Sequence, residues 1–227
     1  MFTFTIRDAE FLNEFMGKIR TYVNKSYKYT MSYLASQVVC DYKDNERLIL
    51  ISINKSAYQN LYSFFHLNDN HMQYAAFSCL ENALYAMRMY YMLVTNPGDM
   101  HTYITSSNFS LEESEKREEE KQQEYSEGQE PFSIKEFYNS LHLFNTFVLK
   151  SPAISSQLYD RNLYLGLSCG KELSDELQNE VRKNFIGAYL SLSIHTKMFF
   201  NGGLDEELED FESELDDDFR EYVKRFS

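Results

Sequence analysis

The chain has 227 residues, and its 35 Asp and Glu residues outnumber its 22 Lys and Arg residues to give a formal net charge of -13. With 43% hydrophobic residues, the chain has enough apolar side chains for a packed interior, which argues against wholesale disorder. Eight glycines and three prolines are few for the frequent turns of a β-sandwich or barrel, and no glycine-rich phosphate-binding motif occurs. The composition therefore predicts an all-α protein, a single-domain bundle of about six to seven helices.

The N-terminal part of the chain, residues 8–105, carries three helical patterns. Apolar residues recur at three- and four-residue steps over residues 8–40, 48–65 and 71–94, which is the spacing expected for helices that bury one face or more. The third pattern is apolar on nearly every face, and Asn96-Pro97-Gly98-Asp99 predicts its end because proline cannot continue the hydrogen-bond ladder. The alternating residues 1–6 are compatible with either a short strand or an extended arm.

The middle of the chain, residues 106–132, has a different composition. Between Glu112 and Glu130 it contains nine acidic residues, three basic residues and a single aromatic residue, Tyr125. Such a segment has little apolar surface to bury, so we expect a charged, partly disordered linker or a solvated helix.

Three more helical patterns follow in residues 133–203, the predicted C-terminal core helices. Ser133 and Glu136 have the spacing of a capping box, which predicts that a helix begins there and continues to Val148. Ser151-Pro152 interrupts the pattern, and further helices are predicted over residues 154–168 and 174–199.

The last segment, residues 204–227, is predicted to be an acidic amphipathic helix. Its apolar residues form one stripe, and its eleven acidic and three basic residues give a net charge of -8. Like charges at neighbouring positions of a helix cost stability, and a basic partner would relieve that repulsion. The alternative is a solvated acidic face on a docked helix. The predicted partner-binding residues are Asp205, Glu206, Glu207, Glu209, Asp210, Glu212, Asp216, Asp217 and Asp218.

The expected partner is a basic protein surface, and a nucleic-acid-binding protein is one candidate because carboxylates on a helix can stand in for phosphates. Direct binding to duplex nucleic acid is not expected, because it needs clustered Lys and Arg, and the patch around Lys18, Lys25 and Lys28 is too small. A homodimer joined through the apolar stripe of the last helix is a further alternative.

Signals for membrane insertion, secretion and disulfide bonding are missing. No apolar run reaches the roughly 20 residues that span a membrane, and the N-terminus lacks the pattern of a signal peptide. The three cysteines, Cys40, Cys79 and Cys169, are an odd number without CxxC spacing, as is typical of reduced thiols. We therefore expect a cytoplasmic protein that does not bind membranes.

Signatures of catalysis are missing as well. No HExxH, GxSxG or zinc-type Cys/His spacing occurs, so no catalytic residue, metal or cofactor is expected. Polar residues do interrupt apolar stretches at Glu81, Arg88 and Arg161, and His195 lies on an apolar helix face. One interpretation is a structural ion-pair network with a core histidine, and the other is a polar pocket between helices.

Two stretches of the chain carry a resemblance to a known family. The order of the segments resembles that of HEPN-like bacterial helical domains. The segments that carry this resemblance are the apolar stretch from Met72 to Arg88, the charged middle, and the stretch from Leu158 to Ser168. Several such domains belong to abortive-infection and toxin–antitoxin systems, and their ribonuclease members use an arginine followed closely by a histidine. Neither Arg88 nor Arg161 is followed by a histidine in that window. The resemblance therefore implies a degenerate member that lacks the nuclease site.

These observations lead to two functional hypotheses of different classes. The first is a non-enzymatic interaction protein of bacterial or phage defence or counter-defence, which binds a basic partner through its acidic segments. The alternative is a HEPN-like enzyme or ligand sensor with a polar pocket around Glu81, Arg88, Arg161 and His195.

Overall fold

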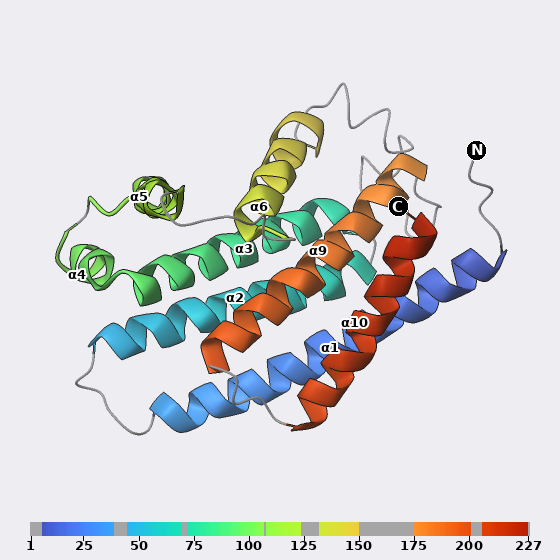
Figure 1. Cartoon of the computed structure of the whole chain (residues 1–227), viewed down its shortest axis with the longest axis horizontal. Helices are drawn as coiled ribbons and strands as arrows, with labels where there is room; N and C mark the ends of the chain where they lie inside the picture. Colours follow the sequence, from blue (N-terminus) through green and yellow to red (C-terminus); the bar gives the residue numbers. More distant parts are fainter. Residues whose placement is uncertain are drawn as a thin grey trace. The chain divides into compact units, whose positions relative to one another are not determined.

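A computed structural model describes residues 6–38, 45–69, 72–106, 108–123, 132–149, 175–200 and 206–226. All regular secondary structure in these ranges is helical, which confirms the predicted all-α class (Figure 1). The elements are α1 (Ile6–Val38), α2 (Asn45–Asp69), α3 (Gln73–Thr95), α4 (Pro97–Thr105), α5 (Leu111–Gln123), α6 (Ile134–Leu143), the π-helix η1 (Phe144–Leu149), α9 (Asp175–Phe200) and α10 (Glu206–Phe226).

Contacts divide the chain into two compact units rather than into consecutive halves. The first unit is formed by Met1–Thr30 together with Leu158–Ser227, and the second by Met31–Gln157. The long helix α1 therefore contributes its first part to one unit and its last part to the other.

The first unit packs α1, α9 and α10 around an aromatic core. Tyr22 of α1 lies at its centre, with its ring 5.7 Å from Tyr189 of α9 in an edge-on arrangement and 6.3 Å from Phe211 of α10 in a stacked one. Aromatic pairs with these geometries contribute beyond the burial of their area. The helical spacing of the core residues in all three helices explains why each buries one face; the residues are Leu12, Phe15, Ile19, Tyr22, Phe185, Tyr189, Leu192, Leu208 and Leu215.

The second unit is built on the antiparallel pair α2 and α3, which run side by side in Figure 1. Their shared core contains small and large apolar side chains at helical spacing, all completely buried: Ala57, Leu61, Phe64, Ala76, Phe77, Leu80, Ala83 and Leu84. The helix α3 is apolar on most of its faces because α2, α4, α5, α6 and η1 all contact it. The prediction of a central, buried helix over residues 71–94 is confirmed.

The C-cap of α3 and the start of α4 both lie in the segment Asn96-Pro97-Gly98-Asp99. The α3 helix ends at Thr95 with Asn96 as its C-cap, as predicted, but Pro97 is also the first residue of α4. Proline suits that position because its missing N–H would have no partner in the first turn. The sequence pattern showed the end of one helix and missed the start of the next.

The acidic middle segment contains a helix. Residues 111–123 form α5, whose first turn is capped by the Ser110 hydroxyl, which accepts a hydrogen bond from the Glu113 amide at 3.3 Å. Of the two forms predicted for this segment, a linker or a helix, residues 111–123 take the second. The predicted helix over 154–168 and the alternating residues 1–5 lie outside the described residues.

The predicted start of α6 is confirmed. The Ser133 hydroxyl accepts a hydrogen bond from the Glu136 amide at 3.3 Å, as a capping serine should.

Replacing this cap gives a test of the local structure. We expect Ser133→Ala to lower the free energy of unfolding by about 1 kcal/mol, because the amides of the first turn lose their side-chain acceptor. The control is Ser140→Ala, which lies at an exposed position inside the same helix and should be neutral or slightly stabilising because alanine is the better helix former. Urea denaturation of both variants measures the difference, and an equal effect of the two would contradict the capping role.

Candidate functional site

The predicted partner-binding acids lie on α10, and the packing of this helix decides which of them face solvent. Leu208 and Leu215 are buried, and the rings of Phe211 and Tyr222 contact Tyr22 and Phe15 of α1. The apolar stripe that was predicted for this segment therefore docks within the first unit. Leu208 and Leu215 are not exposed for a homodimer interface in this structure, and the homodimer that the sequence left open stays a prediction.

Four of the acids bind side chains of other helices, and we call them the inner acids. Two pair with lysines of α1: Glu207 with Lys25 at 2.5 Å and Asp218 with Lys18 at 2.8 Å. The other two contact α9. Asp216 accepts a hydrogen bond from the Tyr189 hydroxyl at 2.8 Å, and the buried Glu212 binds the Ser193 hydroxyl and lies 3.1 Å from the Lys197 ammonium group.

The titration behaviour of these groups follows from the contacts. The hydrogen bond with Asp218 raises the pKa of Lys18, and the hydrogen bond with Lys25 lowers the pKa of the exposed Glu207. Burial, with a smaller contribution from Asp216, raises the pKa of Tyr189. These shifts favour the charged forms of Lys18 and Glu207, so both ion pairs between α1 and α10 are maintained at neutral pH.

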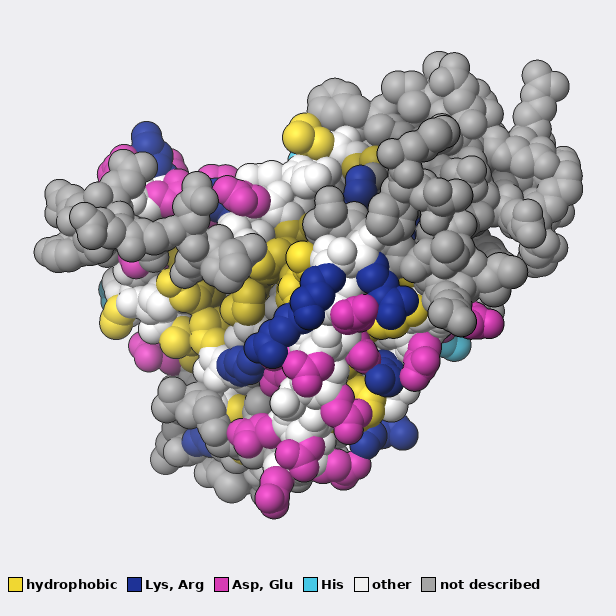
Figure 2. All heavy atoms as spheres, turned by 45° about the vertical axis from the view of Figure 1, so that its right-hand side comes forward, with side chains coloured by type: hydrophobic (Ala, Val, Ile, Leu, Met, Phe, Trp, Pro, Cys, Tyr) yellow, Lys and Arg dark blue, Asp and Glu magenta, His cyan; other side chains and the backbone are white. Residues whose placement is uncertain are grey.

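Five further acids of α10 are exposed, and we call them the outer acidic stripe: Glu206, Glu209, Asp210, Glu214 and Asp217. The last acid of the helix, Glu221, is half-buried and pairs with Arg225 at 2.7 Å. Asp217 contacts Arg220 of the same helix at 3.0 Å, an exposed pair of low expected strength. Within the described chain, no Lys, Arg or His side chain lies within ion-pair distance of Glu206, Glu209 or Asp210. Asp205 lies outside the described residues. On the face drawn in Figure 2, acidic side chains gather in the lower half, with Lys and Arg side chains among them.

The second candidate, a polar pocket around Glu81, Arg88, Arg161 and His195, is described only in part. Arg88 binds Glu115 of α5 rather than Glu81, through two hydrogen bonds of 2.6 Å each. Glu81 instead contacts the His142 ring at 2.5 Å and accepts a hydrogen bond from the side-chain amide of Asn145 at 2.8 Å. Among the described residues, Arg88 and Glu81 thus bind different neighbours, and the predicted network and pocket, which both include Arg161, stay predictions. Arg161 lies outside the described residues.

No local sequence pattern directly marks the residues that bind Arg88 and hold α5. Glu115 is one of nine acids in a segment that looked solvated, yet its side chain is only 7% exposed. Asp99 was assigned to a helix end, yet it is buried and binds the Ser114 hydroxyl and Arg117, the latter at 2.6 Å. A weak signal exists in hindsight, since Leu111, Ser114 and Glu115 have the spacing of one helix face.

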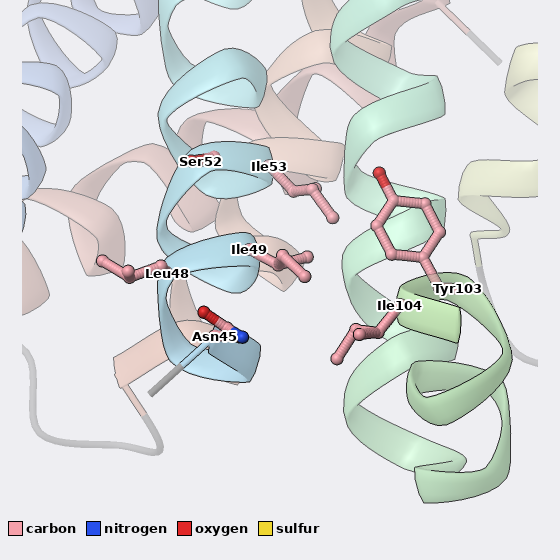
Figure 3. A pocket seen from close by; sticks show the side chains of 7 residues that line it. All are labelled: Asn45, Leu48, Ile49, Ser52, Ile53, Tyr103 and Ile104. Atoms are coloured by element: carbon pink, nitrogen blue, oxygen red, sulfur yellow. The ribbon is translucent and has the colours of Figure 1, made fainter. Parts of the chain in front are cut away.

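A groove lined mainly by apolar side chains lies in the described part of the second unit. It has a volume of about 450 Å³ and lies between α2 and α4 of the second unit. Figure 3 shows Ile49 and Ile53 of α2 projecting toward Tyr103 and Ile104 of α4, whereas Leu48 points away. Its remaining lining residues, Asn45 and Ser52, carry no charge, so the groove offers no acid–base chemistry.

The described residues also lack the features needed for metal binding or for a reactive thiol. They contain no group of three or more His, Cys, Asp or Glu side chains arranged to hold a metal ion. Burial raises the pKa of the Cys79 thiol, which makes it a poor nucleophile at neutral pH. None of the helices in the described residues has the length and hydropathy needed to cross a bilayer.

Comparison with known proteins adds no assignment. No family model matches the sequence, and neither curated proteins nor solved structures give a significant match. The function must therefore be argued from the side chains described above.

His195 belongs to the first unit and is completely buried on α9. Burial lowers the pKa of its imidazole from about 6.5 to about 3, because the charged form would lose its hydration. The imidazole is therefore neutral at physiological pH, which agrees with the interpretation of a core histidine.

This burial predicts a loss of stability in acid. Between pH 6.5 and pH 3 the unfolded chain takes up a proton at His195 that the folded chain does not, so the free energy of unfolding falls as the pH is lowered through this window. At about 1.4 kcal/mol per pH unit, the contribution between pH 6.5 and 4.5 is roughly 2–3 kcal/mol. We expect His195→Gln to flatten the pH dependence by about this amount in urea denaturation.

The control for this measurement is His101→Gln, in which an exposed imidazole of α4 is replaced. Because other titrating groups are common to all three proteins, the difference between the curves isolates each histidine. A wild-type slope in the His195→Gln protein would show that His195 is hydrated in the folded state.

Proposed function

We propose that this protein is a non-enzymatic helical binding module that captures a basic partner surface with the outer acidic stripe of α10. One observation carries the proposal: α10 sorts its acids into two sets. The inner acids bind side chains of α1 and α9, whereas Glu206, Glu209 and Asp210 remain exposed. Within the described residues, the outer acids form no ion pair with another helix, whereas the inner acids, the exposed Glu207 included, already bind a neighbouring helix.

The position of the outer acids along the helix strengthens this argument. Acids in the first turn, such as Glu206 and Glu209, are favoured by the positive end of the helix dipole and need no partner to explain them. Asp210 and Glu214 lie beyond that turn, where the dipole gives little support. Asp210 is four residues from both Glu206 and Glu214, a spacing at which like charges repel by about 0.2–0.5 kcal/mol per pair. A partner with Lys and Arg side chains would relieve this repulsion.

A nucleic-acid-binding protein is the partner class that fits best. Carboxylates at steps of four on a helix recur about every 6 Å along its axis. A row of negative charges on a narrow rod suits a protein surface whose Lys and Arg side chains are arranged to contact phosphates. The resemblance to HEPN-like domains is the basis for placing such a partner in bacterial or phage defence or counter-defence.

The alternative, an enzyme or ligand sensor with an interhelical pocket, has less support. Its proposed residues Arg88 and Glu81 each bind a different neighbour, and His195 is neutral and buried.

The proposal predicts that binding depends on the row formed by Glu206, Asp210 and Glu214. The triple variant Glu206→Gln, Asp210→Asn and Glu214→Gln should bind the basic partner at least about ten-fold more weakly, because three ion pairs are lost. Its stability should be close to that of wild type, since the substitutions also remove repulsion. Carbodiimide cross-linking in a host extract, which joins carboxylates to lysines, identifies the partner and the carboxylates that it contacts. Titration of the purified partner then measures the loss.

The matched control removes the same charge from α5 through Glu112→Gln, Glu113→Gln and Glu120→Gln, all exposed positions. This variant should retain wild-type binding. Equal weakening by both triple variants would mean that only net charge matters, and cross-links confined to other segments would refute the assignment to α10.

A further inference from the structure

The helix α5 is attached to the second unit in an unusual way. Its sequence, LEESEKREEEKQQ, has a single apolar residue, Leu111, which is buried in a cluster with Met89, Met92, Leu93 and Met100. The other buried side chains of α5 are polar: Ser114 binds Asp99, and Glu115 binds Arg88. Beyond its first turn, the helix is therefore held by charge rather than by apolar packing.

Two side chains, Arg88 and Lys135, lie next to the Glu115 carboxylate, and a third, Tyr138, covers Arg88. The Arg88 guanidinium of α3 forms two parallel hydrogen bonds with it, Nε to Oε1 and Nη2 to Oε2, both 2.6 Å long. Lys135 of α6 lies 3.7 Å from the same carboxylate and also pairs with Glu119, a second acid of α5, at 2.5 Å. The ring of Tyr138 covers the guanidinium at 4.3 Å, and the third guanidinium nitrogen, Nη1, is buried without a hydrogen-bond acceptor among the described residues. This arrangement is a preformed site for a carboxylate.

The arrangement is an inefficient way to stabilise a fold. Replacing a buried ion pair by apolar side chains is often neutral or stabilising, because the pair must first be dehydrated. An arginine that is fixed by an aromatic ring and supported by a lysine is the usual means of recognising an anionic group in a ligand. A carboxylate from another chain would find the same three contacts.

We propose that Arg88, Lys135 and Tyr138 form an acceptor site for an acidic helix of a partner, and that Glu115 of α5 occupies this site in the structure described here. Because α5 belongs to the same chain, its local concentration is high, and it competes with any partner helix. A partner that presents a carboxylate in place of Glu115 displaces α5 beyond its first turn and uncovers the site. This surface is separate from the outer acidic stripe of α10 and takes a partner of the opposite charge.

The test removes the Glu115 carboxylate from the site in the 227-residue chain. Glu115→Lys places a positive charge beside Arg88 and Lys135, so α5 should detach beyond Leu111, and its amides should exchange with deuterium at least ten-fold faster while those of α3 stay protected. A labelled peptide with the sequence of residues 111–123 should then bind at least ten-fold more tightly to this variant than to wild type by fluorescence anisotropy. The same peptide with Glu115→Gln should not bind to either protein.

Two further variants serve as controls for the charge change and for the loss of the ion pair. Glu113→Lys makes the same charge change at an exposed position of α5 and should leave both exchange and peptide binding unchanged. The double variant Arg88→Met and Glu115→Leu replaces the pair by apolar side chains, and it should stay folded without binding the peptide. Loss of protection across α3 in the Glu115→Lys protein would make the pair a structural element and overturn the proposal. If that protein does not fold, Glu115→Gln replaces it, and unchanged exchange of α5 there would overturn the proposal as well.

Discussion

The burial of one apolar stripe of α10 is the constraint on which the proposed binding surface depends. Leu208 and Leu215 are buried, and Phe211 stacks on Tyr22, so the rotation of the helix about its own axis is set. Because successive residues of a helix are about 100° apart, that rotation also decides where each acid lies. Acids beside the stripe reach lysines and hydroxyls of α1 and α9, and acids opposite the stripe face solvent. The charge pattern is a consequence of the core.

The helices were predictable because their signals are local. Apolar spacing located the core of α1, α2, α3 and α9, and Ser133 marked the start of α6, since a cap and an amphipathic face each involve residues that are close in sequence. Side-chain partners were not predictable in the same way. Arg88 and Glu81 share a helix and are seven residues apart, yet Arg88 turns to Glu115 and Glu81 contacts His142. Those contacts depend on how α5 and α6 pack on α3, and no local pattern contains that information.

The middle segment shows how composition can mislead. Averaged over residues 112–130, the chain has a strongly polar composition, and that average suggested a linker. A helix, however, presents different residues on different sides, and one side of α5 buries Leu111, Ser114 and Glu115. An average over a segment cannot detect a buried face that consists of three residues. Only a residue-by-residue comparison with the helical period would have shown that Glu115 shares a side with Leu111.

The two acidic helices therefore use their charge in opposite ways. On α10, apolar packing supplies the docking and leaves the outer acids exposed, so added salt weakens their attraction for a partner while the docked core changes little. On α5, a carboxylate is part of the docking itself, and the pair that it forms with Arg88 is shielded from salt by burial. A net charge of -13 describes neither situation. What distinguishes the two helices is the number of apolar side chains that each one buries, because this number decides whether its acids are available to other molecules or already bound within the chain.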